Sequence, residues 1–363
     1  MTASGPALGI AATRRADARA VAWWLIVVAA MVFVMVLIGG TTRLTGSGLS
    51  ITEWQPIMGA LPPLSEADWQ ALFAKYRQSP QFQKVFPDLT LAGFKGIFWL
   101  EYVHRLWGRL IGVVFLVPFL WFWVRGRIPK GYWPALTGLF ALGALQGGLG
   151  WAMVASGLVD RPSVSHYRLA AHLLLAIVIY AAVLWTALGL FQPREDLALA
   201  RSNQGWARLA HVLIALTIAA GALVAGLRAG LLYNSFPLMG GALVPPDYWL
   251  PELGWMNAFE NRPAVQFHHR ALATATLLAV AYLWWRVRAS EGPAVGRGAA
   301  LMLGAVLLQY ALGIVAILRF GQVPPPAAEA VAIGMLHQAG AMLLVTAALW
   351  FAHAARRTTF SSA

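Results

Sequence analysis

The chain has 363 residues, of which 59% are hydrophobic and only 11% are charged, a composition that excludes an ordinary soluble protein and indicates a polytopic membrane protein. It contains no cysteine, which excludes disulfides, thiolate metal sites, iron–sulfur clusters and cysteine nucleophiles. The formal net charge of +13 resembles that of a nucleic-acid-binding protein, but its distribution, described below, argues against a nucleic-acid partner.

Apolar runs of about 20 residues, the length that a membrane-spanning helix needs, recur along the whole chain. They predict an all-α polytopic membrane protein with eight transmembrane helices, at 21–42, 98–124, 133–155, 166–190, 206–228, 266–288, 298–319 and 330–354. The first run is long for the apolar core of a signal peptide and lacks an A-x-A cleavage site behind it, so we expect it to remain as the first helix.

The connection between the first two predicted helices, roughly 43–97, is long. Within it, the segment PLSEADWQALFAKY places Ser65 and Asp68 at the spacing of a capping box, which predicts a short amphipathic helix on the outer surface. The matching connection in the second half, about 229–264, is shorter and richer in Gly and Pro. Long loops of this kind often cover a functional site.

The basic residues indicate the orientation of the chain. If the N-terminus is cytoplasmic, 14 of the 27 Lys and Arg residues fall in the two tails and in the three short inner loops. This is the pattern of the positive-inside rule. We therefore expect both termini in the cytoplasm and attribute most of the excess charge to membrane topology.

An internal repeat relates the two halves of the sequence. EYVHRLWG at 101–108 aligns with QFHHRALA at 266–273, HLLLA at 172–176 with HQAGA at 337–341, and QGGLG at 146–150 with QYALG at 309–313. The repeat predicts two tandem pseudo-symmetric four-helix bundles inserted in the same orientation. The expected divisions are a cytoplasmic tail 1–20, a bundle 21–190, a cytoplasmic linker 191–205, a bundle 206–355 and a cytoplasmic tail 356–363.

Four of the eight histidines belong to this repeat: His104 and His172 in the first half, His269 and His337 in the second. We expect each to lie within about two turns of the outer end of its helix. A lone histidine is more often a packing residue than a ligand, but a pair duplicated at the same spacing favours a ligand role. Two imidazoles on facing helices suit axial ligation of haem iron, whereas zinc or copper sites usually recruit further ligands.

Arginines near the outer ends of the predicted helices are candidates for binding haem propionates, because a guanidinium pairs well with a carboxylate. They are Arg43, Arg105, Arg109, Arg168, Arg228 and Arg270. Snorkelling at the membrane interface would explain one or two of them, but not the duplicated arginine that directly follows His104 and His269. We interpret the remaining histidines, His166, His211, His268 and His353, as structural or interfacial.

The two halves differ at one position beside the histidines. Glu101 lies three residues before His104, on the same helix face, whereas the second half has Gln266 in the equivalent place. A carboxylate beside a haem serves either to move protons or to stabilise developing positive charge. The structural alternative is that Glu101 pairs with Arg105 or Arg43. The residues predict two haem sites, of which the N-terminal one is reactive.

Together with these motifs, GGTTRLTGSGLSITEWQPIMGALPPL at 39–64 and QGGLGWAMVASGL at 146–158 resemble the haem A synthase family over about residues 20–355. The resemblance implies oxidation of the C8 methyl of haem O to a formyl group, through hydroxymethyl intermediates, to make haem A for terminal oxidases. It further implies that His104 and His172 flank the substrate haem O, that His269 and His337 ligate a haem b, and that Glu101 is catalytic. The absence of cysteine matches the proteobacterial and mitochondrial-like branch.

The same resemblance implies a multi-pass protein of the bacterial inner membrane, with its haem sites toward the periplasmic side. The expected partners are membrane lipid, a haem O synthase and the terminal-oxidase assembly machinery, besides an electron donor that the resemblance does not name. A homo-oligomer is left open.

Two other functions compete with this interpretation. A di-haem b-type cytochrome that only relays electrons would also need four histidines, but it does not explain Glu101 against Gln266, and it would normally hold its haems near opposite membrane faces. A transporter built from parallel repeats would need helices broken within the membrane, for which the Gly-rich segment 143–150 is the only indication.

Overall fold

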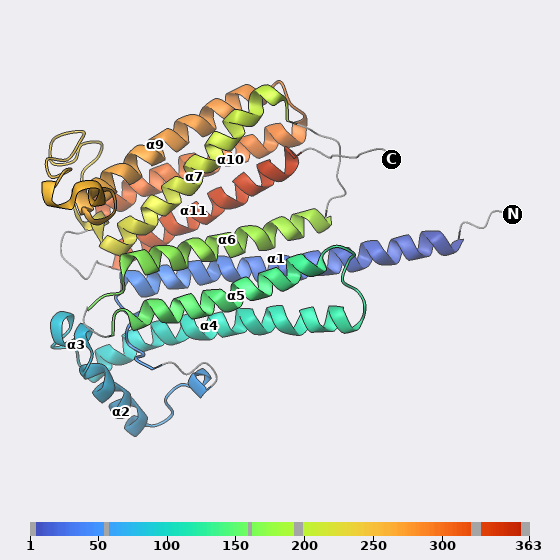
Figure 1. The fold of residues 1–363 in the computed structure, drawn as a ribbon. Coiled ribbons are helices and arrows are strands. Elements are labelled where there is room, and N and C mark those ends of the chain that lie inside the picture. Colours follow the sequence, from blue (N-terminus) through green and yellow to red (C-terminus); the bar gives the residue numbers. More distant parts are fainter. Residues whose placement is uncertain (1–4, 54–57, 159–161, 192–198, 321–327, 357–363) are drawn as a thin grey trace.

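The computed structural model describes residues 5–53, 58–158, 162–191, 199–320 and 328–356, with side chains from residue 14 onward. In these ranges the chain is helical and forms no strand, apart from an isolated bridge between Met239 and Ala242. The predicted linker 191–205 and the tails 1–20 and 356–363 lie partly outside the described residues. Figure 1 shows long helices running side by side, with short helices at one end.

The long helices form two neighbouring groups (Figure 1). One contains α1 (Gly5–Leu44), α4 (Leu91–Val124), α5 (Trp133–Ala155) and α6 (His166–Phe191). The other contains α7 (Arg201–Leu227), α9 (Arg262–Val287), α10 (Pro293–Arg319) and α11 (Ala328–Ala354). The groups meet where α6 packs against α7 and where α11 packs against α1 and α6.

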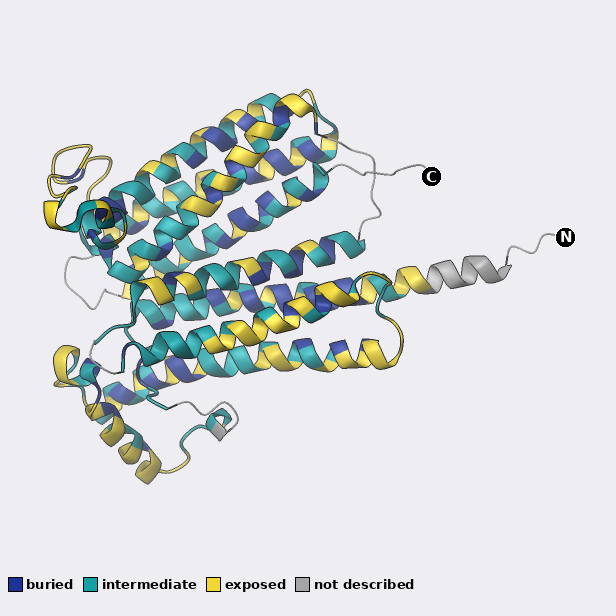
Figure 2. Ribbon diagram, viewed as in Figure 1, coloured by how far each residue is buried: buried dark blue, intermediate teal, exposed yellow. Residues whose placement is uncertain are grey.

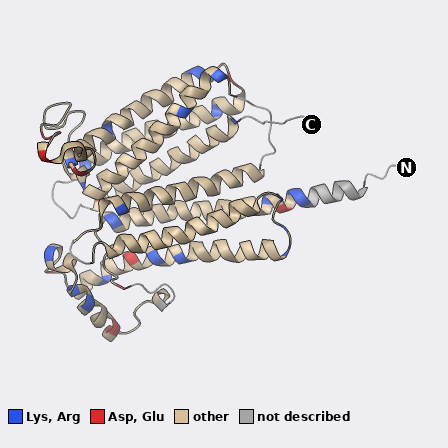
Figure 3. Cartoon of the chain, viewed as in Figure 1, with Lys and Arg blue, Asp and Glu red and all other residues tan. Residues whose placement is uncertain are grey.

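The short elements lie at the end of the molecule opposite the chain termini (Figure 1). They are η1 (Met58–Ala60), α2 (Glu66–Arg77) and α3 (Pro80–Val85) in the first group, and η2 (Ala229–Leu231), η3 (Pro251–Met256) and α8 (Asn257–Glu260) in the second. Both connections that we expected to lie outside are therefore at the same end. Figure 3 shows that many of the Lys and Arg positions lie toward the two ends of the long helices.

The outer faces of the helices are apolar. Figure 2 shows exposed residues along these faces, and many of them are large hydrophobic side chains, such as Val117 at 60% exposure and Leu278 at 65%. In water such a continuous apolar surface would be costly, whereas lipid tails solvate it. The fold is therefore that of a multi-pass membrane protein.

Seven helices in the described part of the chain are long and apolar enough to cross a membrane. The sixth predicted span corresponds to α9, a helix of 26 residues that does not meet the same criterion. Its polarity comes from residues such as Gln266, His268, His269 and Arg270, of which His269 and Arg270 are candidate site residues. The count of eight spans and the tandem bundles thus stay predictions.

Helix α4 begins at Leu91, well before the predicted start at 98. Its additional turns pack against α2, where Trp69 meets Phe98 at 4.9 Å and Tyr76 stacks on Phe94 at 5.2 Å between ring centres. His104 consequently lies about 20 Å along the helix, at 1.5 Å per residue. The expectation that it lies within two turns of the helix start is wrong, because aromatic contacts with the outer loop extend this helix.

Pro118 lies inside α4 and has no N–H to donate to the carbonyl of Val114. In an apolar environment that carbonyl needs another donor. The indole nitrogen of Trp24, on α1, donates to it at 2.8 Å. This hydrogen bond ties α1 to α4 in the core of the first group, where Trp24, Phe115 and Phe119 are buried.

The expected capping box is present at the start of α2. The Ser65 hydroxyl accepts a hydrogen bond from the Asp68 amide at 3.1 Å, and the Asp68 carboxylate accepts one from the Ser65 amide at 3.0 Å. The Ser65 side chain, and then the amides of Ser65 and Leu64, hold the pKa of Asp68 below its usual range. The hydrogen bonds to ionised Asp68 therefore stabilise the helix fully above the ordinary pKa of an aspartate. This stabilisation is lost as the pH falls through the lowered pKa of Asp68.

Replacing Ser65 with alanine is expected to destabilise α2 by about 1 kcal/mol, the usual cost of losing an N-cap side chain. Hydrogen exchange of the α2 amides in detergent micelles would measure it, and those amides should exchange faster in the variant. Gln70→Ala, an exposed change within the same helix, is the matched control and should slow exchange or leave it unchanged. Equal exchange in both variants would contradict the role of the cap.

Candidate functional site

The four duplicated histidines lie on α4, α6, α9 and α11, and each imidazole is partly buried. In the second group, the ring centres of His269 and His337 are 6.4 Å apart, and the ring planes are at 88° to each other. The structure therefore brings together His269 and His337, as the repeat predicted, and the pairing of His104 with His172 stays a prediction.

The separation of His269 and His337 fits two ligands of one metal ion. Two imidazoles on opposite sides of a metal, each bound at about 2 Å, place their ring centres roughly 6 Å apart. In the described part of the chain, no group of three or more His, Cys, Asp or Glu side chains is placed to hold a metal ion. A pair of histidines is the donor set that the predicted axial ligation of a haem iron needs.

The orientation of His269 is fixed by a backbone carbonyl. Its Nδ1 atom donates to the oxygen of Thr217, on α7, at 3.0 Å. This contact selects the tautomer that leaves Nε2 without a proton and able to bind a metal. The chain thus carries at His269 the type of hydrogen bond that commonly orients histidine ligands.

Two glutamines approach His172 and His337, the histidines on the fourth long helix of each group. The side-chain amide nitrogen of Gln146, on α5, lies 3.3 Å from Nε2 of His172, and that of Gln309, on α10, lies 3.4 Å from Nε2 of His337. Gln146 also donates to the backbone carbonyl of His172 at 3.0 Å. These glutamines were not among the predicted site residues. Their matching positions at the start of the aligned segments QGGLG and QYALG were the signal that could have identified them.

Glu101 is 2% exposed and its carboxylate has four hydrogen-bond donors. One oxygen accepts from the Ser50 hydroxyl at 2.7 Å and from the Ile51 amide at 2.8 Å. The other accepts from Nη2 and Nε of Arg105 at 2.5 and 2.9 Å. Glu101 therefore pairs with Arg105, as the structural alternative anticipated, and it anchors the loop that follows α1.

Arg105 extends the same network. Besides Glu101, it donates to the backbone carbonyls of Ile51 at 2.7 Å and Glu53 at 3.0 Å. The ion pair is nearly enclosed, with side-chain exposures of 18% for Arg105 and 3% for Glu101. A buried pair of this kind is stable only while both partners are present.

The second group repeats this arrangement without the charge. Arg270 donates to the carbonyls of Tyr233 at 2.7 Å and Ser235 at 2.9 Å, so it also holds the loop before its own helix. Gln266 donates to the Leu232 carbonyl at 2.7 Å, and its amide oxygen has no hydrogen-bond partner. The two sites therefore share a scaffold but differ by one buried negative charge.

Two of the other predicted propionate arginines donate to backbone carbonyls. Arg43 donates to Ala225 and Gly226 at the end of α7, with its shortest contact at 2.8 Å, and so links the two groups of helices. Arg168 donates to Ala152 at 2.6 Å. Each guanidinium has five N–H groups and keeps donors for a further acceptor.

The remaining two arginines, Arg228 and Arg109, differ in position. Arg228 caps α7 in the left-handed conformation, with a φ of 52°. Arg109 lies on α4 one turn beyond Arg105. The structure therefore gives Arg43, Arg105, Arg168 and Arg270 visible structural contacts, and the propionate role of all six stays a prediction.

The four histidines outside the repeat have local partners. His268 lies 3.0 Å from the Tyr248 hydroxyl, and His166 lies 3.5 Å from the Glu260 carboxylate. His211 lies within 3.1 Å of two backbone carbonyls, and His353 packs edge-on against Trp185. These contacts agree with structural or interfacial roles.

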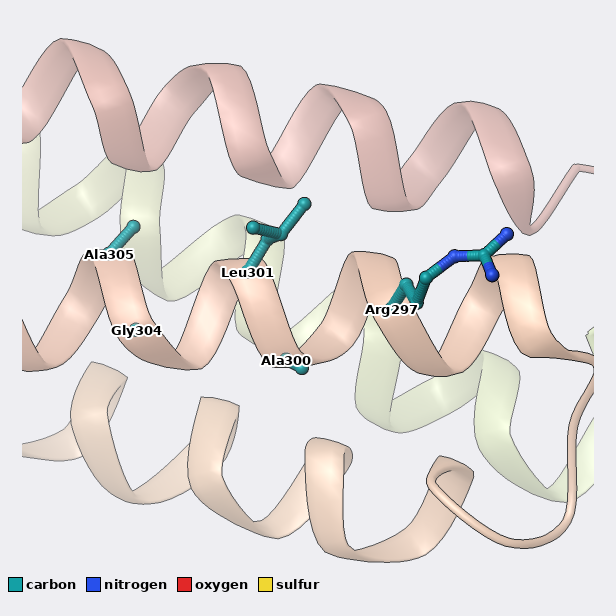
Figure 4. A pocket seen from close by; sticks show the side chains of 5 residues that line it. All are labelled: Arg297, Ala300, Leu301, Gly304 and Ala305. Atoms are coloured by element: carbon teal, nitrogen blue, oxygen red, sulfur yellow. The ribbon is translucent and has the colours of Figure 1, made fainter.

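A hollow along the first half of α10 lies apart from the histidines. Figure 4 shows its lining, which consists of Arg297, Ala300, Leu301, Gly304 and Ala305. The residues are mostly small or apolar, and apart from Arg297 they offer no group able to hold a metal or move a proton. The candidate site is therefore the region of the paired histidines.

Comparison with known proteins places the whole chain in one family. Residues 22–349 match the family model described as cytochrome oxidase assembly protein. The chain is 49% identical over 358 residues to the heme A synthase of Rhodospirillum centenum, covering 98% of this chain and 92% of that protein. It is 49% identical to the heme A synthase of Paramagnetospirillum magneticum, covering 92% of this chain and 93% of the relative. It is 48% identical to that of Nitrosospira multiformis, covering 93% and 94%.

The buried ion pair predicts unequal effects of two matched substitutions. Arg105→Met leaves the Glu101 carboxylate buried without its cation and is expected to destabilise the fold by about 3–5 kcal/mol. Arg270→Met removes only hydrogen bonds to carbonyls and is expected to cost less. Thermal unfolding of both variants in one detergent, followed by circular dichroism, would compare their midpoints.

The double variant Arg105→Met/Glu101→Gln tests whether the uncompensated charge of Glu101 causes the destabilisation. Because it removes the uncompensated charge, it should unfold at a higher temperature than Arg105→Met alone. A double variant that is no more stable than the single one would show that the charge is not the cause.

Proposed function

The chain belongs to the haem A synthase family of cytochrome oxidase assembly proteins, and from this premise we propose that it oxidises the C8 methyl group of haem O to the formyl group of haem A. The first half of the chain binds the substrate and the second half a resident haem b. The observation that carries the proposal is a difference in charge between two similarly arranged sites: a buried carboxylate, Glu101, precedes His104, and a buried amide, Gln266, precedes His269.

The resident haem b is held by His269 and His337. Support comes from the 6.4 Å separation of their ring centres and from the hydrogen bond that fixes His269 to the Thr217 carbonyl. When bound, a bis-histidine haem supplies reversible one-electron transfer. A redox group in the same molecule suits an oxidation, because it can pass electrons between the substrate half and an electron-transfer partner.

The substrate haem O lies between His104 and His172 in the first group of helices. There Glu101 lies on the same face of α4 as His104, about one turn before it. Its carboxylate is held in place by Ser50, Ile51 and Arg105, so it is a fixed negative charge in an apolar surrounding. Such a charge either takes a proton from the reacting carbon's hydroxyl or stabilises positive charge that develops there.

The arginines at the outer ends of the helices bind the propionates of the two haems. Arg105 and Arg270 directly follow His104 and His269, and both already order an outer loop through backbone carbonyls. A guanidinium in this position joins a propionate to the loop above it. Arg43, Arg109, Arg168 and Arg228 are further candidates for the same role.

The protein lies in the bacterial inner membrane with both termini in the cytoplasm and the haem sites toward the periplasmic side. This orientation is supported by the basic residues of the predicted inner loops and by the position of the outer-loop helices opposite the termini. Membrane lipid surrounds it. Its partners are the haem O synthase that supplies its substrate, the terminal-oxidase assembly machinery that takes its product, and an electron-transfer partner.

The first test is an inventory of haems. The protein is expressed with a haem O synthase in a host that lacks haem A, and the extracted pigments are separated by chromatography and identified by mass. Haem A or its hydroxymethyl intermediate is the expected result. Haem b and unconverted haem O alone, in folded protein with a working electron supply, would favour the relay cytochrome.

Glu101→Gln is expected to retain haem b and to lose formation of haem A, because the variant lacks the fixed charge at the substrate. The same inventory measures both pigments. Ser50→Ala is the matched control: it removes one hydrogen bond to Glu101 and leaves the carboxylate, so it should cost stability while product still forms. Normal haem A formation by Glu101→Gln would exclude a catalytic role for this residue.

The histidine pairs are expected to respond differently to substitution. His269→Ala and His337→Ala should each lose the resident haem b, since one axial ligand disappears from the site. His104→Ala and His172→Ala should retain haem b and lose product, because they affect the substrate half. Optical spectra of the purified reduced proteins report haem b, and its retention in both His269→Ala and His337→Ala would refute the cofactor site.

A further inference from the structure

Each of the four duplicated histidines lies against a glycine on a neighbouring helix. His104 faces Gly39 on α1, His172 faces Gly150 on α5, His269 faces Gly221 on α7, and His337 faces Gly313 on α10. The geometry was not visible in the repeat alone, because only Gly150 and Gly313 fall in segments that align clearly. In both groups the histidine of the second long helix meets the first, and that of the fourth meets the third.

The contacts leave no room for a side chain. A Cβ atom at Gly150 or Gly221 would lie 2.9 Å from Cε1 of the facing imidazole, and one at Gly313 would lie 3.0 Å from it. At Gly39 the nearest atom would be Nε2 of His104, at 3.1 Å. A half-turn of that ring about its Cβ–Cγ bond exchanges Nε2 with Cε1 and makes the four contacts alike.

Some other glycines on α5, α7 and α10 have no close neighbour. A Cβ atom added at Gly147 or Gly148 on α5, at Gly205 on α7 or at Gly304 on α10 meets nothing within 4 Å. Glycine within a helix costs about 1 kcal/mol relative to alanine, so close approach of another group is a physical reason to keep it. The histidine-facing glycines have that reason, whereas these four do not.

The close approach of the ring to a helix at a glycine also brings it within hydrogen-bond distance of groups on that helix. Nδ1 of His269 donates to the oxygen of Thr217, which lies one helical turn before Gly221. Gln146 and Gln309, the glutamines that contact His172 and His337, lie at the same distance before Gly150 and Gly313. In three of the four contacts, the glycine and the residue one turn earlier therefore both touch the histidine.

We propose that Gly39, Gly150, Gly221 and Gly313 are positioning residues that seat the four histidine ligands. Each lets an imidazole approach a helix backbone closely, so that helix packing fixes the ring before a haem binds. The proposal rests on the haem assignments made above. It extends them to residues that touch no haem atom and act only through the histidines.

The test compares glycine-to-alanine substitutions within one helix. Gly313→Ala and Gly304→Ala both change α10, and Gly221→Ala and Gly205→Ala both change α7. Purified proteins are assayed for haem b content and for the low-spin optical and electron paramagnetic resonance signals of a bis-histidine haem. Gly313→Ala and Gly221→Ala should lose haem b or its low-spin signal, while Gly304→Ala and Gly205→Ala keep both.

The first group of helices gives the complementary result. Gly39→Ala and Gly150→Ala should keep the haem b signals and fail to give the spectral change that added haem O produces in the parent protein. Gly147→Ala is the control on α5 and should bind haem O normally. Loss of haem b in Gly39→Ala or Gly150→Ala would contradict the pairing of glycines with sites.

Rescue with free imidazole separates positioning from general damage to the fold. His337→Gly removes the tethered ligand, and added imidazole should restore the low-spin signal. In Gly313→Ala/His337→Gly, free imidazole can shift to avoid the new methyl group, so the signal should return there too. Rescue in the single variant but not in the double one would overturn the proposal, because the methyl group would then disturb the site itself.

The outcomes also distinguish this proposal from the cofactor assignment. If Gly313→Ala and Gly221→Ala bind haem b with an unchanged spectrum while His337→Ala and His269→Ala lose it, the positioning role is wrong and the haem b site stands. If the histidine variants keep haem b as well, the cofactor site itself is wrong.

Discussion

The ion pair between Glu101 and Arg105 is the interaction on which the N-terminal site depends. It is buried in an apolar helix bundle, where neither charge is stable alone, and it joins α4 to the loop that follows α1 through Ser50 and Ile51. The loop, the carboxylate and the helix that carries His104 are thus one unit. In the proposed function this support keeps the Glu101 carboxylate fixed beside the reacting atom.

The second group of helices uses the same scaffold for a different purpose. Arg270 orders its outer loop as Arg105 does, but the acid is replaced by Gln266, so the charge is absent while the geometry persists. The two halves therefore place similar residues around His104 and His269 and differ in one buried negative charge, which is the difference that the proposed function assigns to a reactive site and a resident-cofactor site.

Polar contacts across the two groups place the sites relative to each other. Arg43 holds the end of α7, Gln338 on α11 donates to the Val36 carbonyl on α1 at 3.0 Å, and Tyr180 on α6 bonds with Thr346 on α11 at 2.7 Å. In lipid there is little hydrophobic drive for helices to associate, so hydrogen bonds and close packing decide which helices meet.

The sequence by itself determined the membrane class and the capped helix at Ser65, because hydropathy and the spacing of a capping box are properties of residues close along the chain. The internal repeat predicted which histidines pair, and the structure brings His269 and His337 together. It also indicated the difference between Glu101 and Gln266. Only the tertiary structure decided the extended start of α4 and the partner of each buried polar group. Those partners are distant in sequence, and many are backbone carbonyls. Close contacts with a glycine, such as that of His269 with Gly221, are also invisible in the spacing of polar residues.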